Sequence, residues 1–170
     1  MAPKPMLTLL STTLHDCRMS GTRAHASGIT VSTQPRIGEL IIFFDIDSTE
    51  GRQSLKMEGE GISICDYLIF YTTNGEAFEI VCFLELKGTN LEVAAKQVQE
   101  THKHVKDLSD EQIPVRHHQN FISKICICLR SHAPSTKQRI RDQLKQKFGN
   151  EHVEIKHGTT RYDIGQLLRR

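Results

Sequence analysis

Three charged side chains stand in segments that otherwise have the composition of β-strands. Glu85 and Lys87 are two residues apart in FLELKG, so on a strand they project from the same face. Asp66 lies in the preceding apolar run, and Asn74 and Gly75 between the two runs are typical of a tight hairpin turn. The two runs are expected to pair antiparallel. One bulge or a small offset in register would then bring Asp66 beside Glu85.

Two carboxylates that converge on a sheet form an oxygen-rich site of the kind that Mg²⁺ or Mn²⁺ prefers. An ion of this type polarises a phosphate and lowers the pKa of its bound water. Burial of an unpartnered charge costs free energy, so Glu85 and Lys87 within an apolar strand indicate a partner or a metal ion. We therefore interpret Asp66 and Glu85 as metal ligands and Lys87 as the group that orients the attacking water, a set suited to phosphodiester hydrolysis.

A second pair of carboxylates offers an alternative chemistry. IIFFDIDST fits the first motif of the haloacid-dehalogenase-like phosphatases, in which Asp45 would be the nucleophile and Asp47 the general acid-base. The later acidic pair of that family is absent, and a Gly-rich segment with strands replaces the α/β unit that should follow. Asp47 and Ser48 are then interpreted as a polar turn that ends a strand.

The order of elements comes from apolar periodicity, caps and breakers. Strands are expected over 40–46, 62–71, 78–87, 121–129 and 153–157, with a loop or hairpin over 48–61. Helices are expected from Thr89 or Asn90 to Leu108, and from a Ser135 cap to Gly149. A loose helix over 6–17, a loop over 18–28, a short strand over 29–33 and a terminal turn or helix over 162–168 complete the prediction.

This order predicts an α/β fold with a mixed central β-sheet flanked by helices. The first three strands can form a meander, and the crossover helix then makes the fourth strand parallel to its neighbour. The strand at 78–87 is nearly continuous in apolar residues and is expected at the centre, covered on both faces. We expect an N-terminal extension, partly helical or irregular, over 1–37, and a single domain over 38–170.

The segments ICDYLIF and FLELKGTN, followed by the helical AAKQVQETHKHV, resemble the PD-(D/E)XK nuclease superfamily over roughly residues 38–130. The resemblance implies a restriction-endonuclease-like β-β-β-α-β core and a Mg²⁺ or Mn²⁺ cofactor. It assigns the family's acid to Asp66, its Glu-x-Lys to Glu85 and Lys87, and its helical glutamine to Gln97 or, failing that, Gln99. Cys65 stands where the proline of the name would be. The family's further acid has no clear counterpart, and the candidates are Glu39, Glu58 and Glu60.

Charge is distributed unevenly along the 170 residues. From Arg130 onward, ten Lys and Arg face four Asp and Glu, a net +6, whereas the first 129 residues carry −4. A basic segment of this kind suits a protein that meets a polyanion on one face, although solvated lysine-rich helices are also common. The predicted nucleic-acid contacts are Arg130, Lys137, Arg139 and Arg141, with DNA favoured over RNA.

Composition favours a globular chain, at 38% hydrophobic and 25% charged residues, with no apolar run long enough to span a membrane. The start of the chain lacks the pattern of a secretory signal, so a cytoplasmic location is expected. The five cysteines have no metal-binding spacing and are interpreted as reduced core thiols. His102 and His104 face apart on a helix, His117 and His118 lie in an expected loop, and all four are interpreted as surface residues.

The sequence thus predicts a metal-dependent nuclease that uses Asp66, Glu85, Lys87 and Gln97. The main alternative is a catalytically inactive nucleic-acid-binding or assembly module of the same fold, and the third is the phosphatase that would use Asp45 and Asp47. A chain of this size covers one scissile bond, so cutting both strands would require a homodimer or a partner protein.

Overall fold

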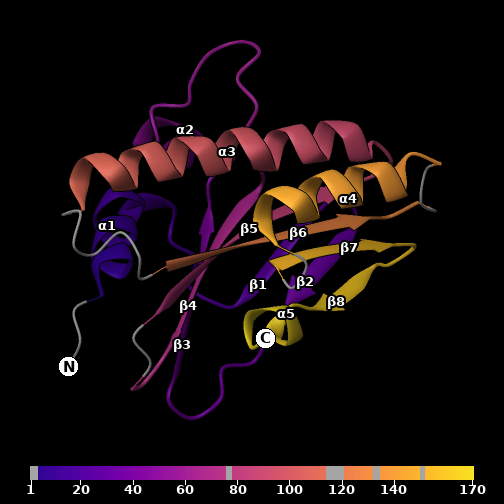
Figure 1. The fold of residues 1–170 in the computed structure, drawn as a ribbon. Helices are drawn as coiled ribbons and strands as arrows, with labels where there is room; N and C mark the ends of the chain where they lie inside the picture. Colours follow the sequence, from indigo (N-terminus) through magenta and orange to yellow (C-terminus); the bar gives the residue numbers. More distant parts are fainter. Residues whose placement is uncertain (1–3, 76–77, 114–120, 132–134, 150–151) are drawn as a thin grey trace.

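Five strands form the main sheet in the order β3-β4-β5-β6-β7 (Figure 1). The computed structural model describes residues 4–75, 78–113, 121–131, 135–149 and 152–170. The strands span Glu39–Asp45, Tyr67–Thr73, Glu79–Lys87, Phe121–Leu129 and Val153–His157. β3, β4 and β5 pair antiparallel, whereas β5, β6 and β7 pair parallel. The predicted α/β fold with a mixed, helix-flanked sheet is confirmed.

β5 is the middle strand of the sheet, and it is buried on both faces from Glu79 to Leu86. Val81 and Phe83 pack into the core on one face, and Cys82 and Leu84 into the core on the other. A strand buried in this way needs apolar side chains in both alternating sets, which explains its continuous apolar sequence. The prediction of a central, doubly covered strand is confirmed.

The helices begin and end at identifiable caps. Their bounds are Pro5–Thr13 (α1), Thr49–Ser54 (α2), Leu91–Gln112 (α3), Lys137–Phe148 (α4) and Gly165–Leu168 (α5), with a 3-10 turn at His15–Cys17. The Asn90 side chain accepts a hydrogen bond from the amide of Val93 at 3.0 Å, as the expected cap does. α4 ends at Gly149, whose φ of +92° is a conformation that glycine adopts without steric cost.

Two caps differ from the prediction. α2 lies inside the expected loop over 48–61, because the Ser48 hydroxyl accepts from the amide of Gly51 at 3.1 Å and starts a helical turn there. The N-cap of α4 is Thr136 and not Ser135, and no side chain caps it. A local polar residue can therefore initiate a turn that apolar periodicity does not reveal.

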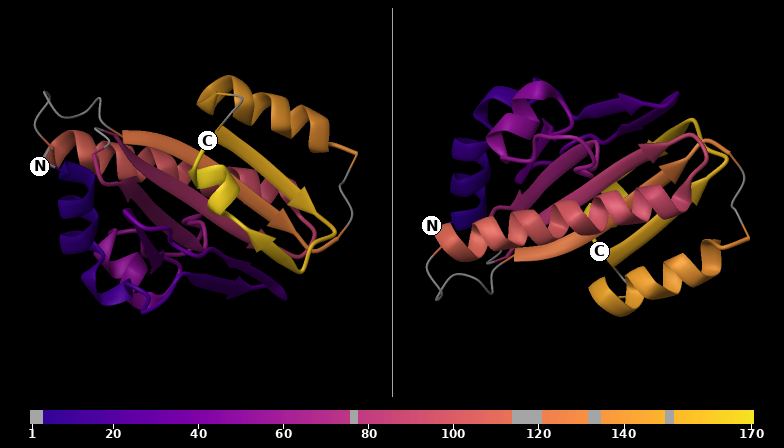
Figure 2. Two further views of the ribbon diagram at one scale, coloured as in Figure 1. Left: turned by 90° about the horizontal axis from the view of Figure 1, so that it is seen from below. Right: turned by 90° about the horizontal axis from the view of Figure 1, so that it is seen from above.

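Helices α1, α3 and α4 cover one face of the main sheet, with α3 lying along β5 and β6 (Figure 2, right). This face contains the larger core, to which the helices contribute apolar side chains such as Leu10, Val98 and Leu144. Apolar residues at helical spacing provide that contact, as predicted for α3 and α4. The helix-covered face is the one on which the candidate site lies.

A second, three-stranded sheet covers the opposite face together with α5 (Figure 2, left). Its strands are β1 (Arg23–Ala26), β2 (Ile29–Ser32) and β8 (Arg161–Asp163), in the order β1-β2-β8. β1 and β2 form a hairpin, and β8 pairs parallel with β2. The described part of the predicted N-terminal extension, residues 4–37, thus contributes α1 to one core and two strands to the other.

Two buried charged side chains anchor the outer elements to the main sheet. The Glu79 carboxylate accepts hydrogen bonds from the amides of Met6 and Leu7, at 3.0 and 2.8 Å, and so satisfies free amides in the first turn of α1. Lys124 on β6 is 1% exposed, and its ammonium group donates to the carbonyl of Leu167 in α5 at 2.6 Å. Burial of these charges is compatible with folding because each has hydrogen-bond partners.

A bidentate ion pair joins the first strand of the main sheet to the last helix. The guanidinium of Arg169 donates to both oxygens of Glu39, at 2.7 and 2.9 Å, and Tyr71 donates to the same carboxylate at 3.2 Å. The hydrogen bond from Arg169 is the main cause that lowers the pKa of Glu39 from 4.5 to about 2, with a further contribution from the amide of Arg36. Glu39 is therefore committed to this structural contact.

We expect Arg169→Gln to lower the free energy of unfolding at pH 7 by about 1–3 kcal/mol, the usual value of hydrogen bonds to a charged group. A carboxylate with a lowered pKa stabilises the fold above its ordinary pKa and loses that effect as the pH falls towards the folded value. The difference between wild type and variant should therefore shrink between pH 4.5 and pH 2. Urea unfolding across this range measures it.

Arg170→Gln is the matched control, because Arg170 pairs with Glu154 at 3.2 Å but is 53% exposed. Its effect should be below about 1 kcal/mol, as for other exposed pairs. Equal losses in the two variants would contradict the special role of the Glu39–Arg169 pair.

All five cysteines are buried free thiols. Burial is the main cause that raises the pKa of Cys82 to about 12, so this thiol packs as a small apolar group. No helix in the described parts of the chain is long and apolar enough to cross a membrane.

Candidate active site

The register of β4 and β5 brings Asp66 beside Glu85. Tyr67 is paired with Leu84, so Asp66, which immediately precedes β4, lies opposite Glu85. The side chains of Glu85 and Lys87 continue the alternating set of Phe83, which belongs to the helix-covered face. No bulge is needed, and the predicted meeting of Asp66 and Glu85 occurs in the structure.

The carboxylates of Asp66 and Glu85 each accept a hydrogen bond from a backbone amide of the neighbouring strand segment. The amide of Asp66 donates to Oε2 of Glu85 at 3.1 Å, and the amide of Leu86 donates to Oδ2 of Asp66 at 2.7 Å. The ammonium group of Lys87 lies 3.0 Å from Oε1 of Glu85, an ion pair without hydrogen-bond geometry. The Glu85 side chain is fully buried, Asp66 is half-buried, and the Lys87 side chain is 28% exposed, so Lys87 connects the buried carboxylate of Glu85 to solvent.

Both carboxyl groups have a raised pKa. Burial is the main cause for Asp66, and the amide of Leu86 and the charge of Lys87 oppose it. Burial is also the main cause for Glu85, followed by the charge of Asp66, while Lys87 opposes both. One ammonium group therefore does not compensate the burial and mutual repulsion of these two carboxylates.

α3 fixes the segment that precedes Asp66. The side-chain amide of Gln97 donates to the carbonyl of Ile64 at 2.8 Å, and the Thr101 hydroxyl accepts from the amide of Cys65 at 2.9 Å. These contacts replace strand pairing over 62–66, so β4 begins at Tyr67 and not at residue 62 as predicted. Thr101 was predicted only as a position of the helix stripe, and its side-chain acceptor function has no signal in the sequence.

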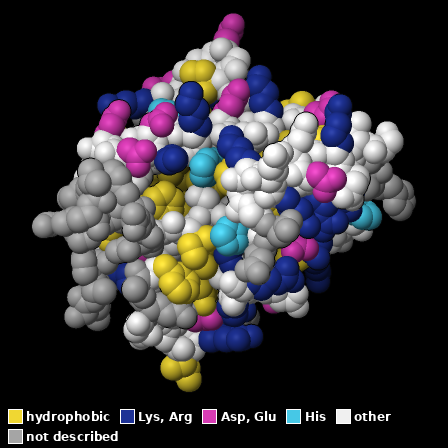
Figure 3. Space-filling model, in the orientation of Figure 1, with side chains coloured by type: hydrophobic (Ala, Val, Ile, Leu, Met, Phe, Trp, Pro, Cys, Tyr) yellow, Lys and Arg dark blue, Asp and Glu magenta, His cyan; other side chains and the backbone are white. Residues whose placement is uncertain are grey.

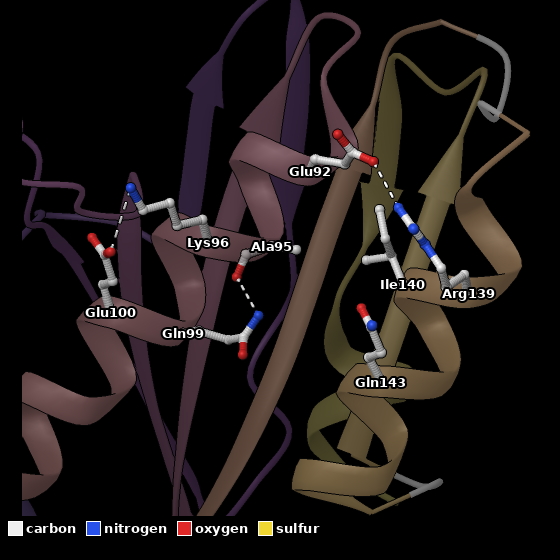
Figure 4. Close-up of a pocket in the computed structure, with 8 residues that line it drawn as sticks. All are labelled: Glu92, Ala95, Lys96, Gln99, Glu100, Arg139, Ile140 and Gln143. Atoms are coloured by element: carbon white, nitrogen blue, oxygen red, sulfur yellow. Dashed lines mark hydrogen bonds and ion pairs between the residues drawn. The ribbon is translucent and has the colours of Figure 1, made fainter.

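The structure distinguishes the two candidate glutamines. Oε1 of Gln97 is buried and has no hydrogen-bond partner among the described residues, so it is available for a further contact near Asp66. Gln99 instead lines the groove between α3 and α4, where its side chain donates to the carbonyl of Ala95 at 3.1 Å (Figure 4). Gln97 is therefore the glutamine that contacts the candidate site.

The FFDIDST segment ends beside Asp66. The amides of Ile46 and Asp47 donate to the carbonyl of Asp66, at 3.2 and 3.3 Å. The Asp47 carboxylate forms an ion pair with Arg52 at 2.6 Å. Asp45 continues the opposite face of the sheet, by strand alternation, and burial is the main cause that raises its pKa. Asp47 is thus the acid of this segment that approaches the candidate site.

The three acids considered as a further metal ligand fare differently. Glu39 lies at the far end of β3 from Asp45 and is engaged by Arg169, which excludes it. Glu58 and Glu60 are exposed in the connection between α2 and β4.

The predicted nucleic-acid contacts separate into groups. Arg130 follows β6, and its amide donates to the carbonyl of Lys87 at 3.0 Å, which places it next to the site. Lys137 and Arg141 lie close to Lys156, and after burial these two neighbours lower the pKa of Lys137. Arg139 turns away from this group and pairs with Glu92 at 3.0 Å (Figure 4). Figure 3 shows Lys and Arg side chains gathered where α4 and β7 lie.

The histidine predictions need one correction. His102 is half-buried and not a freely exposed surface residue, because its ring packs edge-on against Phe83 and Phe148, with centroids 5.2 and 4.7 Å away. Burial is the main cause that lowers the pKa of His102 to about 4. His104 is half-buried and contacts the carbonyl of Leu55, and the predicted loop positions of His117 and His118 lie outside the described residues.

The donor set suits a hard divalent ion that keeps several waters. Mg²⁺ is commonly held by one or two carboxylates together with water and substrate phosphate oxygens. Asp66 and Glu85 supply two carboxylates, Oε1 of Glu85 pairs with the ammonium group of Lys87 at 3.0 Å, and Oε1 of Gln97 is buried without a hydrogen-bond partner among the described residues. In the described parts of the chain, no group of three or more His, Cys, Asp and Glu side chains could enclose a metal ion. The residues present therefore fit a Mg²⁺ or Mn²⁺ ion with an incomplete protein shell.

Comparison of the chain with protein-family models, with curated proteins and with solved structures gives no significant match.

Proposed function

We propose that the protein is a metal-dependent nuclease that hydrolyses phosphodiester bonds of nucleic acid. The observation that carries the proposal is the contact between Asp66 and Glu85 at the end of the central strands, with the ammonium group of Lys87 3.0 Å from Glu85. Each carboxylate accepts one backbone amide and Glu85 pairs with Lys87, but the pKa of both carboxyl groups stays raised, and a divalent ion would compensate their charge. The same three residues carry the resemblance to the PD-(D/E)XK superfamily.

In this proposal Asp66 and Glu85 hold the divalent ion, which supplies polarisation of the phosphate and a water of lowered pKa. Lys87, partly open to solvent, orients the attacking water and neutralises charge that develops on the phosphate. Gln97 is a positioning residue, because it holds the Ile64 carbonyl and so fixes the segment that carries Asp66. Asp47 is a further acid close to Asp66, and its charge helps to raise the pKa of Asp66.

The proposed substrate is DNA. Arg130 stands next to the site, and Lys137, Arg141 and Lys156 form a cationic group on the side of α4 and β7. Such a group favours a polyanion, whose phosphates would lower the repulsion between these cations. A single site of this kind cleaves one strand, so a double-strand break would require a second copy of the chain or a partner protein.

Supercoiled plasmid tests the proposal. Wild-type protein with Mg²⁺ or Mn²⁺ should convert it to the nicked form, and EDTA or Asp66→Asn should abolish the conversion. Asp45→Asn is the matched control, since Asp45 lies on the other face of the sheet, and it should retain cleavage. The cleavage rate is measured by gel electrophoresis.

The other candidate functions predict different results. Protein that shifts DNA in a gel but cleaves no DNA or RNA with any divalent ion would be a binding or assembly module. Turnover of a small phosphomonoester that Asp45→Asn abolishes would identify the phosphatase. Either result would overturn the nuclease proposal.

A further inference from the structure

The outer face of the second sheet is polar, in contrast to its inner face. Along β1, β2 and β8 the inward side chains, such as Ala24 and Val31, are buried against the main sheet. The alternating outward positions are Arg23, His25, Thr30, Ser32, Arg161 and Asp163. Most of them, together with Tyr162, line a shallow hollow of about 420 Å³. This face therefore presents hydroxyl and charged groups to solvent.

Positive charge on this face exceeds negative charge, because its outward positions hold two arginines and one acid. Arg23 and Arg161 are exposed, and neither forms an ion pair within the described ranges. The single acid, Asp163, uses Oδ1 to accept from the amide of Gly165 at 2.9 Å. Hydroxyl groups of Thr30 and Ser32 lie between the two arginines. Guanidinium and hydroxyl groups in this arrangement are donors suited to phosphate oxygens.

The hairpin of this sheet packs on the face of the main sheet opposite the candidate active site, beside the start of β4. The hydroxyl of Tyr67, whose side chain points to that opposite face, donates to the carbonyl of His25 at 3.0 Å. The guanidinium of Arg130 lies against Gly28 in the hairpin turn, where a Cβ atom would be 3.0 Å from Nη1. Figures 1 and 2 show the hairpin extending to the same edge of the molecule at which β5 and β6 end. A ligand at that edge could therefore continue onto the outer face of the second sheet.

We propose that the outer face of β1, β2 and β8 binds the phosphate backbone of the duplex DNA substrate, with Arg23 and Arg161 as the principal contacts. In the strand register, Arg23 lies two strands away from Arg161 and two residues further along the strand direction. Standard strand spacings then give a separation of roughly 12 Å between their Cα atoms. The major groove of B-DNA is about 12 Å wide, whereas that of A-form RNA is deep and narrow. Two arginines at this separation can contact phosphates on both sides of the DNA groove. The inference rests on the proposed nuclease function, because it extends the substrate from that site.

Fluorescence anisotropy with a labelled DNA duplex in EDTA tests the inference without cleavage. The double variant Arg23→Ala/Arg161→Ala should bind about tenfold or more weakly at low salt. Its plot of log affinity against log salt concentration should lose about 1.8 units of slope, since each phosphate contact contributes about 0.9. Arg23→Lys/Arg161→Lys keeps the charge and should restore most of the slope.

Arg36→Ala/Lys103→Ala is the matched control, because both residues are exposed and lie off the second sheet, and it should keep the wild-type slope. Wild-type slope in the Arg23/Arg161 double variant, in a protein that still cleaves DNA, would overturn this inference and leave the nuclease proposal standing. Equal loss in the control would also overturn it. Tighter wild-type binding of duplex RNA would overturn the commitment to DNA, and binding of neither would overturn both proposals.

Discussion

Glu85→Gln is expected to lose DNA cleavage and to unfold at a higher temperature than wild type in the absence of divalent ions. Metal-ion catalysis contributes several kcal/mol, so removal of a ligand should lower the cleavage rate by about 10³-fold. Stability should rise because burial and the neighbouring charge of Asp66 raise the pKa of Glu85, which means that the folded state disfavours its carboxylate. Glutamine has nearly the same shape and no charge.

The pH dependence of this effect has a definite sign. A carboxyl whose folded pKa is raised contributes stability below its ordinary value and loses it as the pH rises through the folded value. The free energy of unfolding of the wild type should therefore fall as the pH rises above 4.5, and that of the Glu85→Gln variant should fall less. The gain in the variant is thus larger at pH 8 than at pH 5, as thermal unfolding in EDTA can measure.

Glu79→Gln is the matched control for Glu85→Gln. Both glutamates are buried on the same face of β5, but Glu79 accepts two amide hydrogen bonds from α1. Burial raises the pKa of Glu79 as well, but two amide hydrogen bonds oppose that shift, so its replacement should raise stability less than Glu85→Gln does and should leave cleavage unchanged. Unchanged cleavage in Glu85→Gln would remove Glu85 from the proposed mechanism. Loss of both stability and cleavage would make Glu85 a structural residue.

Lys124→Ala is expected to produce a large loss of stability without a direct effect on the site. The substitution leaves the Leu167 carbonyl without its 2.6 Å donor and opens a cavity where the four-carbon stem was buried. Truncation of a long buried side chain to Ala typically costs about 2–5 kcal/mol, and we expect a value in the upper half of that range. Urea unfolding at pH 7 measures this free energy.

Lys124→Met separates the two causes of that loss. Methionine fills most of the volume and removes the desolvation cost of a buried ammonium group, so the loss should be less than half of that in Lys124→Ala. If methionine is as damaging as alanine, the charge of Lys124, and not its volume, determines the stability of the contact with α5.

The elements of the main sheet could be predicted from the sequence because each has a strong local signal. The turn at Asn74 and Gly75 indicates that β4 and β5 pair antiparallel, and the apolar run of β5 indicates that this strand lies at the centre of the sheet. The Asn90 cap indicates where α3 begins. The register between Asp66 and Glu85 could not be predicted. The register of a hairpin depends on its turn type and loop length, which the apolar pattern of the two strands does not give. Contacts of 64–66 with Gln97, Thr101 and the end of β3 then hold the segment before β4.

The second sheet had one local signal, the alternation that predicted a short strand over 29–33, and β2 at Ile29–Ser32 confirms it. β1 contains four residues and β8 contains three, too few for alternation to distinguish them from loops. The pairing of β2 with β8 joins residues about 130 positions apart, for which no periodicity within one segment exists. The roles of Arg23 and Arg161 therefore become visible only once these strands lie side by side, and the same holds for the pairing of Arg139 with Glu92.

The parallel pairing of β2 with β8 also bears on the order of assembly during synthesis. β2 ends at residue 32, and its partner strand β8 comprises residues 161–163. The three-stranded sheet can therefore form only after the ribosome has synthesised nearly all of the described chain. A nascent chain that already contains Asp66, Glu85 and Lys87 would thus lack the proposed surface for DNA until residues 161–163 have been synthesised.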